Sequence, residues 1–303
     1  MRADTSKLQL FYYHKVGRGN AQAKDWLSGN NPLERPATVA FFGPITVDDI
    51  RNLRHKGLKP EQFSQIQEFV STANDPAKRD QTCILVVDAK VWFLKAAGEI
   101  EERKRDTRKM MPVEVILTRE LNEVPPILAG IGSNQYLVRG TYRRISEEKN
   151  RGNLKAIYSV LEKPWEQRWY DDDPSGLLEC LSSVQLETLV AKILETHACF
   201  VPAYRGGSQK YVDLFAFSDR LIDIDGLEID SSGVQIQVKG GARLRKGTLP
   251  DDVHLIGYAC ENVGRPYFDE GWLFAQINAL PEVQEWLRRS LYWVPEDFMR
   301  MYL

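Results

Sequence analysis

Apolar and polar residues alternate strictly from Val234 to Lys239, in the segment VQIQVK. Successive side chains of a β-strand point to opposite faces of its sheet, so this period of two predicts a strand. The apolar residues then share one face, and the other face carries Gln235, Gln237 and Lys239. An amide and an ammonium group therefore project together from this strand.

The segments before this strand add two acids. Tyr211 to Phe217 is predicted as a strand, and Asp213 places a charge inside its apolar run. Ser182-Ser183 is typical of a helix N-cap, and the helix that follows has apolar residues at the 3.6-residue period. These apolar residues are Leu186, Leu189, Val190, Ile193 and Leu194. Glu187 lies at the edge of that stripe, where it can reach toward the sheet.

This order of residues indicates phosphodiester chemistry. Cleavage of a phosphodiester is assisted by a divalent ion, and Mg²⁺ prefers oxygen ligands such as one or two carboxylates. A nearby lysine supplies a point charge for the phosphate. Each residue alone also fits an exposed helix, a solvated strand face or an ion pair. We therefore expect Asp213, Gln237 and Lys239 to converge, with their polar groups within about 4 to 8 Å, a span that a hydrated ion bridges.

The segments LSSVQLETLVAKILETHACFVPAYRGGSQKYVDLFAF and VQIQVKGG carry a family resemblance. They resemble the Mrr-like branch of the PD-(D/E)XK nuclease superfamily over about residues 181–260. The resemblance implies that Asp213 and the Val238 carbonyl hold the metal, with Gln237 in the second acidic position. Lys239 then positions or activates the water, and Glu187 matches the helix glutamate of the family. The loop GGSQKYVD is poorer in Asp and Gly than is usual there.

The resemblance implies a metal-dependent endodeoxyribonuclease, a hydrolase of duplex DNA of the restriction or anti-phage defence type. The expected cofactor is Mg²⁺, with Mn²⁺ as a substitute. A double-strand cut needs two sites, which a homodimer would supply. Two alternatives stay open: a catalytically inactive nuclease-like protein for DNA binding or assembly, and a nuclease that acts on RNA.

The 303 residues suit two domains. Residues 1–150 are mainly β in pattern, with a hairpin predicted at Asp88-Ala89. Residues 151–176 are predicted as a linker region, and residues 177–303 as the nuclease domain. We expect an α+β or α/β fold there, with a central mixed sheet flanked by helices. Within it, Gly271 to Ile277 is predicted as a last strand and Pro281 to Tyr292 as a closing helix.

The first 150 residues are loosely similar to small β-barrel readers of the PUA/EVE/YTH kind, which implies a recognition or sensing domain. Reading a flipped base requires aromatic walls and a few polar groups. The candidate aromatic side chains are Phe11, Tyr12, Tyr13, Trp92 and Phe93. The same rings also suit a hydrophobic core.

The net charge of −2 and the pI of about 6.2 exclude a strongly basic nucleic-acid binder. Contact with DNA must therefore come from local patches. After the predicted strand, the candidates for this contact are Gly240, Gly241, Arg243, Arg245 and Lys246. Further basic clusters are Arg103, Lys104, Arg105, Arg108 and Lys109, and Arg139, Arg143 and Arg144.

The remaining features predict a cytoplasmic protein that does not enter a membrane. The four cysteines form no C-x-x-C pair and match no zinc spacing, so we expect reduced thiols. The first residues lack the apolar stretch of a signal peptide, and no apolar run is long enough to span a membrane.

Overall fold

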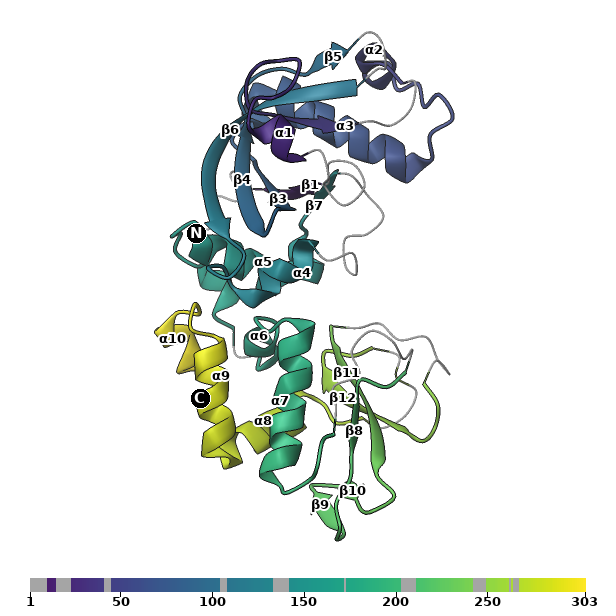
Figure 1. Cartoon of the computed structure of the whole chain (residues 1–303), viewed down its shortest axis with the longest axis vertical. Coiled ribbons are helices and arrows are strands. Elements are labelled where there is room, and N and C mark those ends of the chain that lie inside the picture. The colour runs from purple at the N-terminus through teal and green to yellow at the C-terminus, as the bar shows by residue number, and fades with distance from the viewer. Residues whose placement is uncertain are drawn as a thin grey trace, which may run out of the picture. The chain divides into compact units, whose positions relative to one another are not determined.

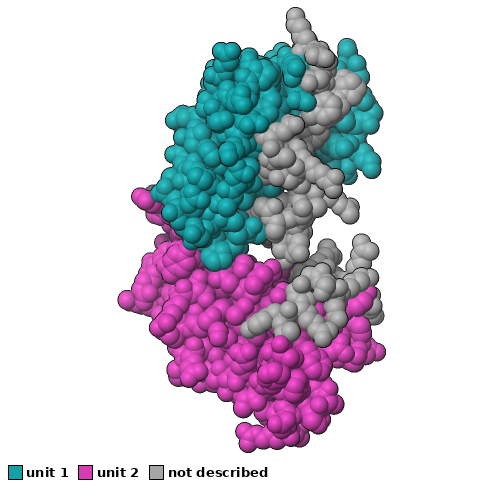
Figure 2. Space-filling view, viewed as in Figure 1, with its two compact units in different colours: residues 1–150 teal, residues 151–303 magenta. Residues whose placement is uncertain are grey.

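The computed structural model describes residues 10–14, 23–40, 45–103, 108–132, 142–171, 173–202, 211–241, 249–261, 263 and 267–303. The chain divides into two compact units, Met1–Asn150 and Arg151–Leu303 (Figure 2). The boundary lies inside helix α5 (Glu147–Val160), where Asn150 leaves helical geometry with φ −142° and ψ 32°. Both units mix helices and strands.

Unit 1 is built around a curled mixed sheet (Figure 1). The order of its described strands is β2-β6-β4-β3-β1-β7, with β5 paired to β6. β1 and β3 run parallel, and the other described pairs are antiparallel. The bounds are β1 (Phe11–His14), β2 (Ala37–Ala40), β3 (Thr82–Val87), β4 (Lys90–Ala96), β5 (Glu101–Arg103), β6 (Arg108–Glu120) and β7 (Tyr142–Arg144). The helices are α1 (Ala23–Leu27), α2 (Val47–Arg51), α3 (Pro60–Asn74), η2 (Pro76–Lys78) and α4 (Pro126–Gly132).

The hairpin predicted at Asp88-Ala89 joins β3 to β4. Both turn residues have left-handed backbone, with φ of 52° and 57°. A two-residue turn of this hand matches the twist of antiparallel strands.

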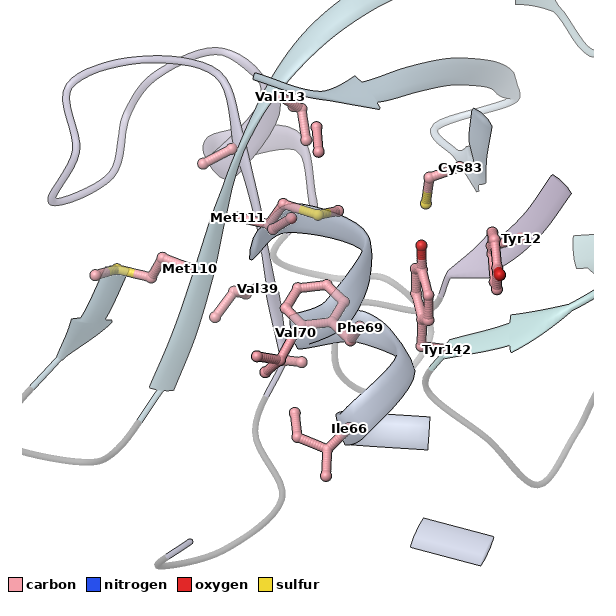
Figure 3. Close-up of a cluster of buried hydrophobic side chains, with 14 of the residues drawn as sticks. Tyr12, Val39, Ile66, Phe69, Val70, Cys83, Met110, Met111, Val113 and Tyr142 are labelled. Atoms are coloured by element: carbon pink, nitrogen blue, oxygen red, sulfur yellow. The ribbon is translucent and has the colours of Figure 1, made fainter. Parts of the chain in front are cut away.

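The core of unit 1 lies between α3 and the sheet (Figure 3). The helical spacing of Phe63, Ile66, Phe69, Val70 and Ala73 buries all five against the strands. The rings of Tyr12 and Tyr142 stack beside them with centroids 4.8 Å apart. This packing anchors the edge strand β7 to the sheet.

Residues 151–176, for which the sequence predicts a linker, belong to unit 2. They contain the end of α5, the turn η3 (Gln167–Trp169) and the start of α6 (Ser175–Leu178). The Arg151 guanidinium contacts the carboxylates of Asp171 and Glu179, each at 2.5 Å. Lys155 is fully buried and donates to the Gly176 carbonyl at 2.9 Å. The segment is thus a packed part of the unit.

Unit 2 has a smaller mixed sheet in the order β12-β11-β8 among the described strands. They are β8 (Leu214–Ala216), β11 (Val234–Gly240) and β12 (Val253–Tyr258), and β9 (Ile222–Ile224) pairs with β10 (Leu227–Ile229) as a separate hairpin. β8 runs antiparallel to β11, and β12 runs parallel to it. The helices are α7 (Ser183–Thr196), α8 (Glu270–Ala279), α9 (Pro281–Ser290) and α10 (Glu296–Met299). Figure 1 shows α7 next to this sheet, with α8 and α9 beyond it.

The strand predicted at residues 271–277 is wrong, because these residues form part of α8. The Asp269 side chain accepts from the Trp272 backbone N–H at 3.1 Å and caps the helix. A short apolar run such as GWLFAQI does not separate strand from buried helix by periodicity alone. The predicted closing helix is present as α9.

None of the helices in the described part of the chain has the length and apolar character needed to cross a membrane.

Candidate functional site

Strand β11 is the centre of the candidate site. It pairs with β8 through Ile236 and Leu214 and with β12 through Lys239 and Gly257. A Cβ atom on Gly257 would lie 1.9 Å from the Lys239 carbonyl oxygen, so this close strand contact requires glycine. The backbone of Lys239 is therefore held firmly by its neighbour.

Asp213 binds β11 through both its backbone and its carboxylate. Its backbone N–H donates to the Ile236 carbonyl at 2.9 Å. Its Oδ2 accepts from the Val238 backbone N–H at 2.8 Å and from the amide Nε2 of Gln237. The Lys239 Nζ lies 3.4 Å from the same oxygen. The sequence-predicted acid, amide and amine are thus brought together, and they lie closer than the expected 4 to 8 Å because they pair directly.

Burial is graded across this cluster. Asp213 and Gln237 are buried, whereas the Lys239 side chain is 38% exposed. The carboxylate therefore sits in a partly dry environment, where hydrogen bonds and charges act more strongly than in water. Lys239 connects it to solvent, which is the side from which a charged ligand can approach.

Glu187 is positioned by α7. The helix begins with a capping box in which the Ser182 Oγ accepts from the Gln185 N–H, and Glu187 follows in the second turn. Burial raises the pKa of Glu187, the Asp213 charge raises it further, and the Lys239 charge opposes both. These interactions place Glu187 in electrostatic range of the cluster.

The donors in this cluster suit a hard cation. Asp213 Oδ2 is engaged, but Oδ1 accepts no hydrogen bond from the described residues. The Gln237 amide donates through Nε2, which leaves its oxygen as a further acceptor. These two oxygens are of the kind that Mg²⁺ prefers as ligands, with waters completing its shell. Within the described ranges no three His, Cys, Asp or Glu side chains cluster as a metal site, so the set depends on the amide.

The two glycines after β11 have roles in packing. A Cβ on Gly240 would lie 2.5 Å from the ring of Tyr258, and the Gly241 N–H donates to the Tyr258 carbonyl at 3.0 Å. Gly241 also has left-handed backbone with φ 57°. Chain packing therefore explains both residues, which the sequence predicts as nucleic-acid contacts. Arg243, Arg245 and Lys246 lie outside the described residues.

Several candidates in unit 1 are core residues. Phe11, Tyr12, Tyr13 and Phe93 are buried. These buried rings cannot stack on a base.

Of the basic clusters in unit 1, Lys109 is fully buried and its Nζ lies 3.3 Å from Glu102, so it cannot contact a phosphate. Arg143 and Arg144 are exposed on β7. Lys104, Arg105 and Arg139 lie outside the described residues.

A set of aromatic residues beside the site was missed at the sequence level. Phe215 and Phe217 continue the two-residue spacing from Asp213, and Phe200 contacts Phe217. The signal was present in the segment YVDLFAF, where residues 213, 215 and 217 fall on one face.

Comparison of the chain with models of protein families, with curated proteins and with solved structures found no match.

Proposed function

We propose that unit 2 is a metal-dependent endonuclease that hydrolyses phosphodiester bonds of DNA, in a PD-(D/E)XK-type arrangement. The observation that carries the proposal is the meeting of Gln237, Val238 and Lys239 at one carboxylate oxygen of Asp213. A buried acid with a partly exposed lysine beside it is a charge arrangement suited to a phosphate and a cation.

Mg²⁺ or Mn²⁺ would be held by Oδ1 of Asp213 and by the side-chain oxygen of Gln237. In the family pattern, the backbone carbonyl of Val238 is the third ligand from the protein. When bound, the ion would neutralise phosphate charge and acidify water.

Hydrolysis forms a bond from a water oxygen to phosphorus and breaks the bond from phosphorus to O3′. The attacking water must lose a proton, and the leaving O3′ must take up a proton, which solvent supplies. Glu187 is the proposed proton acceptor, because its raised pKa makes it a stronger base than an ordinary carboxylate. The Lys239 ammonium holds the phosphate and offsets the negative charge that develops on it.

Unit 1 is the proposed recognition or sensing domain, of the PUA/EVE kind, and defence against phage is the proposed context. Its exposed Arg143 and Arg144 on the edge strand β7 provide positive charge for phosphates.

The test is cleavage of plasmid DNA, modified phage DNA and RNA by the purified chain, with Mg²⁺, Mn²⁺ or EDTA. Asp213→Asn and Lys239→Ala are expected to lower the cleavage rate about a hundredfold or more, as loss of one charge-stabilising group does elsewhere. Asp219→Ala is the control, because Asp219 is an exposed acid of the same unit. This variant should cleave DNA at the wild-type rate.

Three results would reject or redirect the proposal. Unchanged cleavage by Asp213→Asn would place the activity elsewhere. A wild-type chain that binds DNA but leaves every substrate intact in both metals would favour the inactive, nuclease-like alternative. Cleavage of RNA alone would favour the ribonuclease alternative.

A further inference from the structure

Three phenylalanine rings form a continuous row on the sheet of unit 2. Phe200 and Phe217 exchange backbone hydrogen bonds of 2.8 and 3.1 Å, so their side chains share a face. Their ring centroids are 5.1 Å apart, and those of Phe217 and Phe215 are 6.0 Å apart. We call Phe200, Phe215 and Phe217 the aromatic row.

The aromatic row leads to the candidate site. Asp213 comes directly before β8 and two residues before Phe215. The carboxylate of Asp213 contacts the side chains of Gln237 and Lys239, which lie on the same face of β11 as Gln235, the partner of Phe215 in register. This face of the sheet therefore carries partly exposed aromatic rings, the buried Asp213 carboxylate and the partly exposed Lys239 ammonium group.

Phe200, the residue of the row farther from Asp213 in the chain, is exposed to solvent, and Phe215 packs against Gly233. Phe200 is 58% exposed, and Phe215 and Phe217 are partly exposed. A Cβ on Gly233 would lie 2.5 Å from Phe215 Cζ, so this glycine makes room for the ring. A single exposed apolar residue is ordinary, but a row of rings in mutual contact beside a charged site is a surface suited to a ligand with flat groups and phosphates.

We propose that the aromatic row stacks the unpaired bases of a single nucleic-acid strand whose phosphate lies at Lys239. This inference rests on the proposed function and narrows its substrate to DNA that is single-stranded next to the scissile bond, in contrast to the intact duplex expected from the sequence. Bases within a duplex already stack on each other and present only their edges, whereas unpaired bases offer the flat faces that stack on aromatic side chains. The Lys239 ammonium provides the matching charge for the backbone.

The test measures binding of the full-length chain in EDTA, so that cleavage does not interfere. The probes are a fluorescently labelled oligothymidylate, an abasic oligonucleotide of the same length and a duplex, followed by fluorescence anisotropy. The wild type is expected to bind oligothymidylate more tightly than the other two probes. Phe200→Ala should weaken that binding about tenfold, equivalent to about 1.4 kcal/mol, and leave binding of the abasic strand unchanged.

Tyr292→Ala is the matched control, because Tyr292 is an aromatic residue of the same unit, 62% exposed and outside the row. It should bind all probes as the wild type does. Phe200→Leu keeps an apolar side chain without a ring, and should also weaken binding. Equal binding by Phe200→Ala and the wild type, equal loss on the abasic strand, or tighter binding of the duplex would each overturn the inference.

The two proposals fail separately. If Phe200→Ala weakens binding of base-bearing strands but the wild type cuts nothing with Mg²⁺ or Mn²⁺, the aromatic row stands and the nuclease proposal falls. If Lys239→Ala abolishes cleavage while Phe200→Ala binds normally, the nuclease stands and the role of the row is rejected.

Discussion

At the scale of single residues, Asp213 organises the candidate site. One of its oxygens receives an amide, a backbone N–H and an ammonium group, while Glu187 adds a second carboxylate nearby. Two acids therefore face one lysine. The excess negative charge is partly buried, so it lowers the stability of the folded chain. The same charge attracts a cation.

Replacement of Glu187 by glutamine should show how much the charged carboxylate lowers the stability of the folded chain. A raised pKa means that folded Glu187 holds its proton more tightly than the unfolded residue, so stability falls as pH rises from 4.5 through the raised value. We expect Glu187→Gln to be more stable than the wild type at pH about 8, and the difference to shrink as the pH falls toward 4.5. Urea denaturation at several pH values measures it.

Glu195→Gln is the control, since Glu195 is exposed on the same helix. If both variants show the same pH dependence of stability, the charge at position 187 does not lower the free energy of unfolding.

At the scale of elements, the start of α7 decides where Glu187 points. Ser182 and Gln185 form a reciprocal capping box, which fixes the first turn and therefore the helical phase of the following residues. The partner strand β11 is held in register by β8 and β12 on its two sides. The capping box therefore fixes the position of Glu187 on α7, and strand pairing fixes the positions of Gln237 and Lys239 on β11.

Ser182→Ala should lower the free energy of unfolding by about 1 kcal/mol, because the Gln185 N–H loses its acceptor. Ser183→Ala, one residue later at an exposed position without the cap bond, should change it by less than about 0.5 kcal/mol. Denaturant unfolding monitored by circular dichroism compares the two. Equal losses would show that the cap does not set the stability of this helix.

At the scale of the whole molecule, each unit has its own core. Phe69 is completely buried in unit 1 and Phe298 in unit 2. Units with separate cores unfold as separate cooperative steps when few contacts couple them. The recognition role proposed for unit 1 and the nuclease role proposed for unit 2 would then depend on separately stable parts.

Phe69→Ala and Phe298→Ala test this division as a matched pair. Each should destabilise its own unit by about 3 to 5 kcal/mol, the usual effect of truncating a buried phenylalanine. In scanning calorimetry, Phe69→Ala should shift one transition and Phe298→Ala the other. A single transition that both variants lower equally would mean that the units unfold together.

The sequence by itself determined the features that depend on neighbouring residues. The alternation of Val234 to Lys239, the cap at Ser182 and the turn at Asp88-Ala89 were all predictable, because backbone geometry and capping act over a few residues. The same local pattern failed at residues 271–277, where a short apolar run suits both a strand and a helix.

Only the tertiary structure decided which distant side chains meet. Asp213 and Lys239 are 26 residues apart, and their 3.4 Å contact depends on the pairing of β8 with β11. The burial of Lys109 and Phe93 and the raised pKa of Glu187 likewise arise from segments that approach after folding. Such properties depend on the dielectric surroundings and charges supplied by remote parts of the chain, and no short window of sequence contains them.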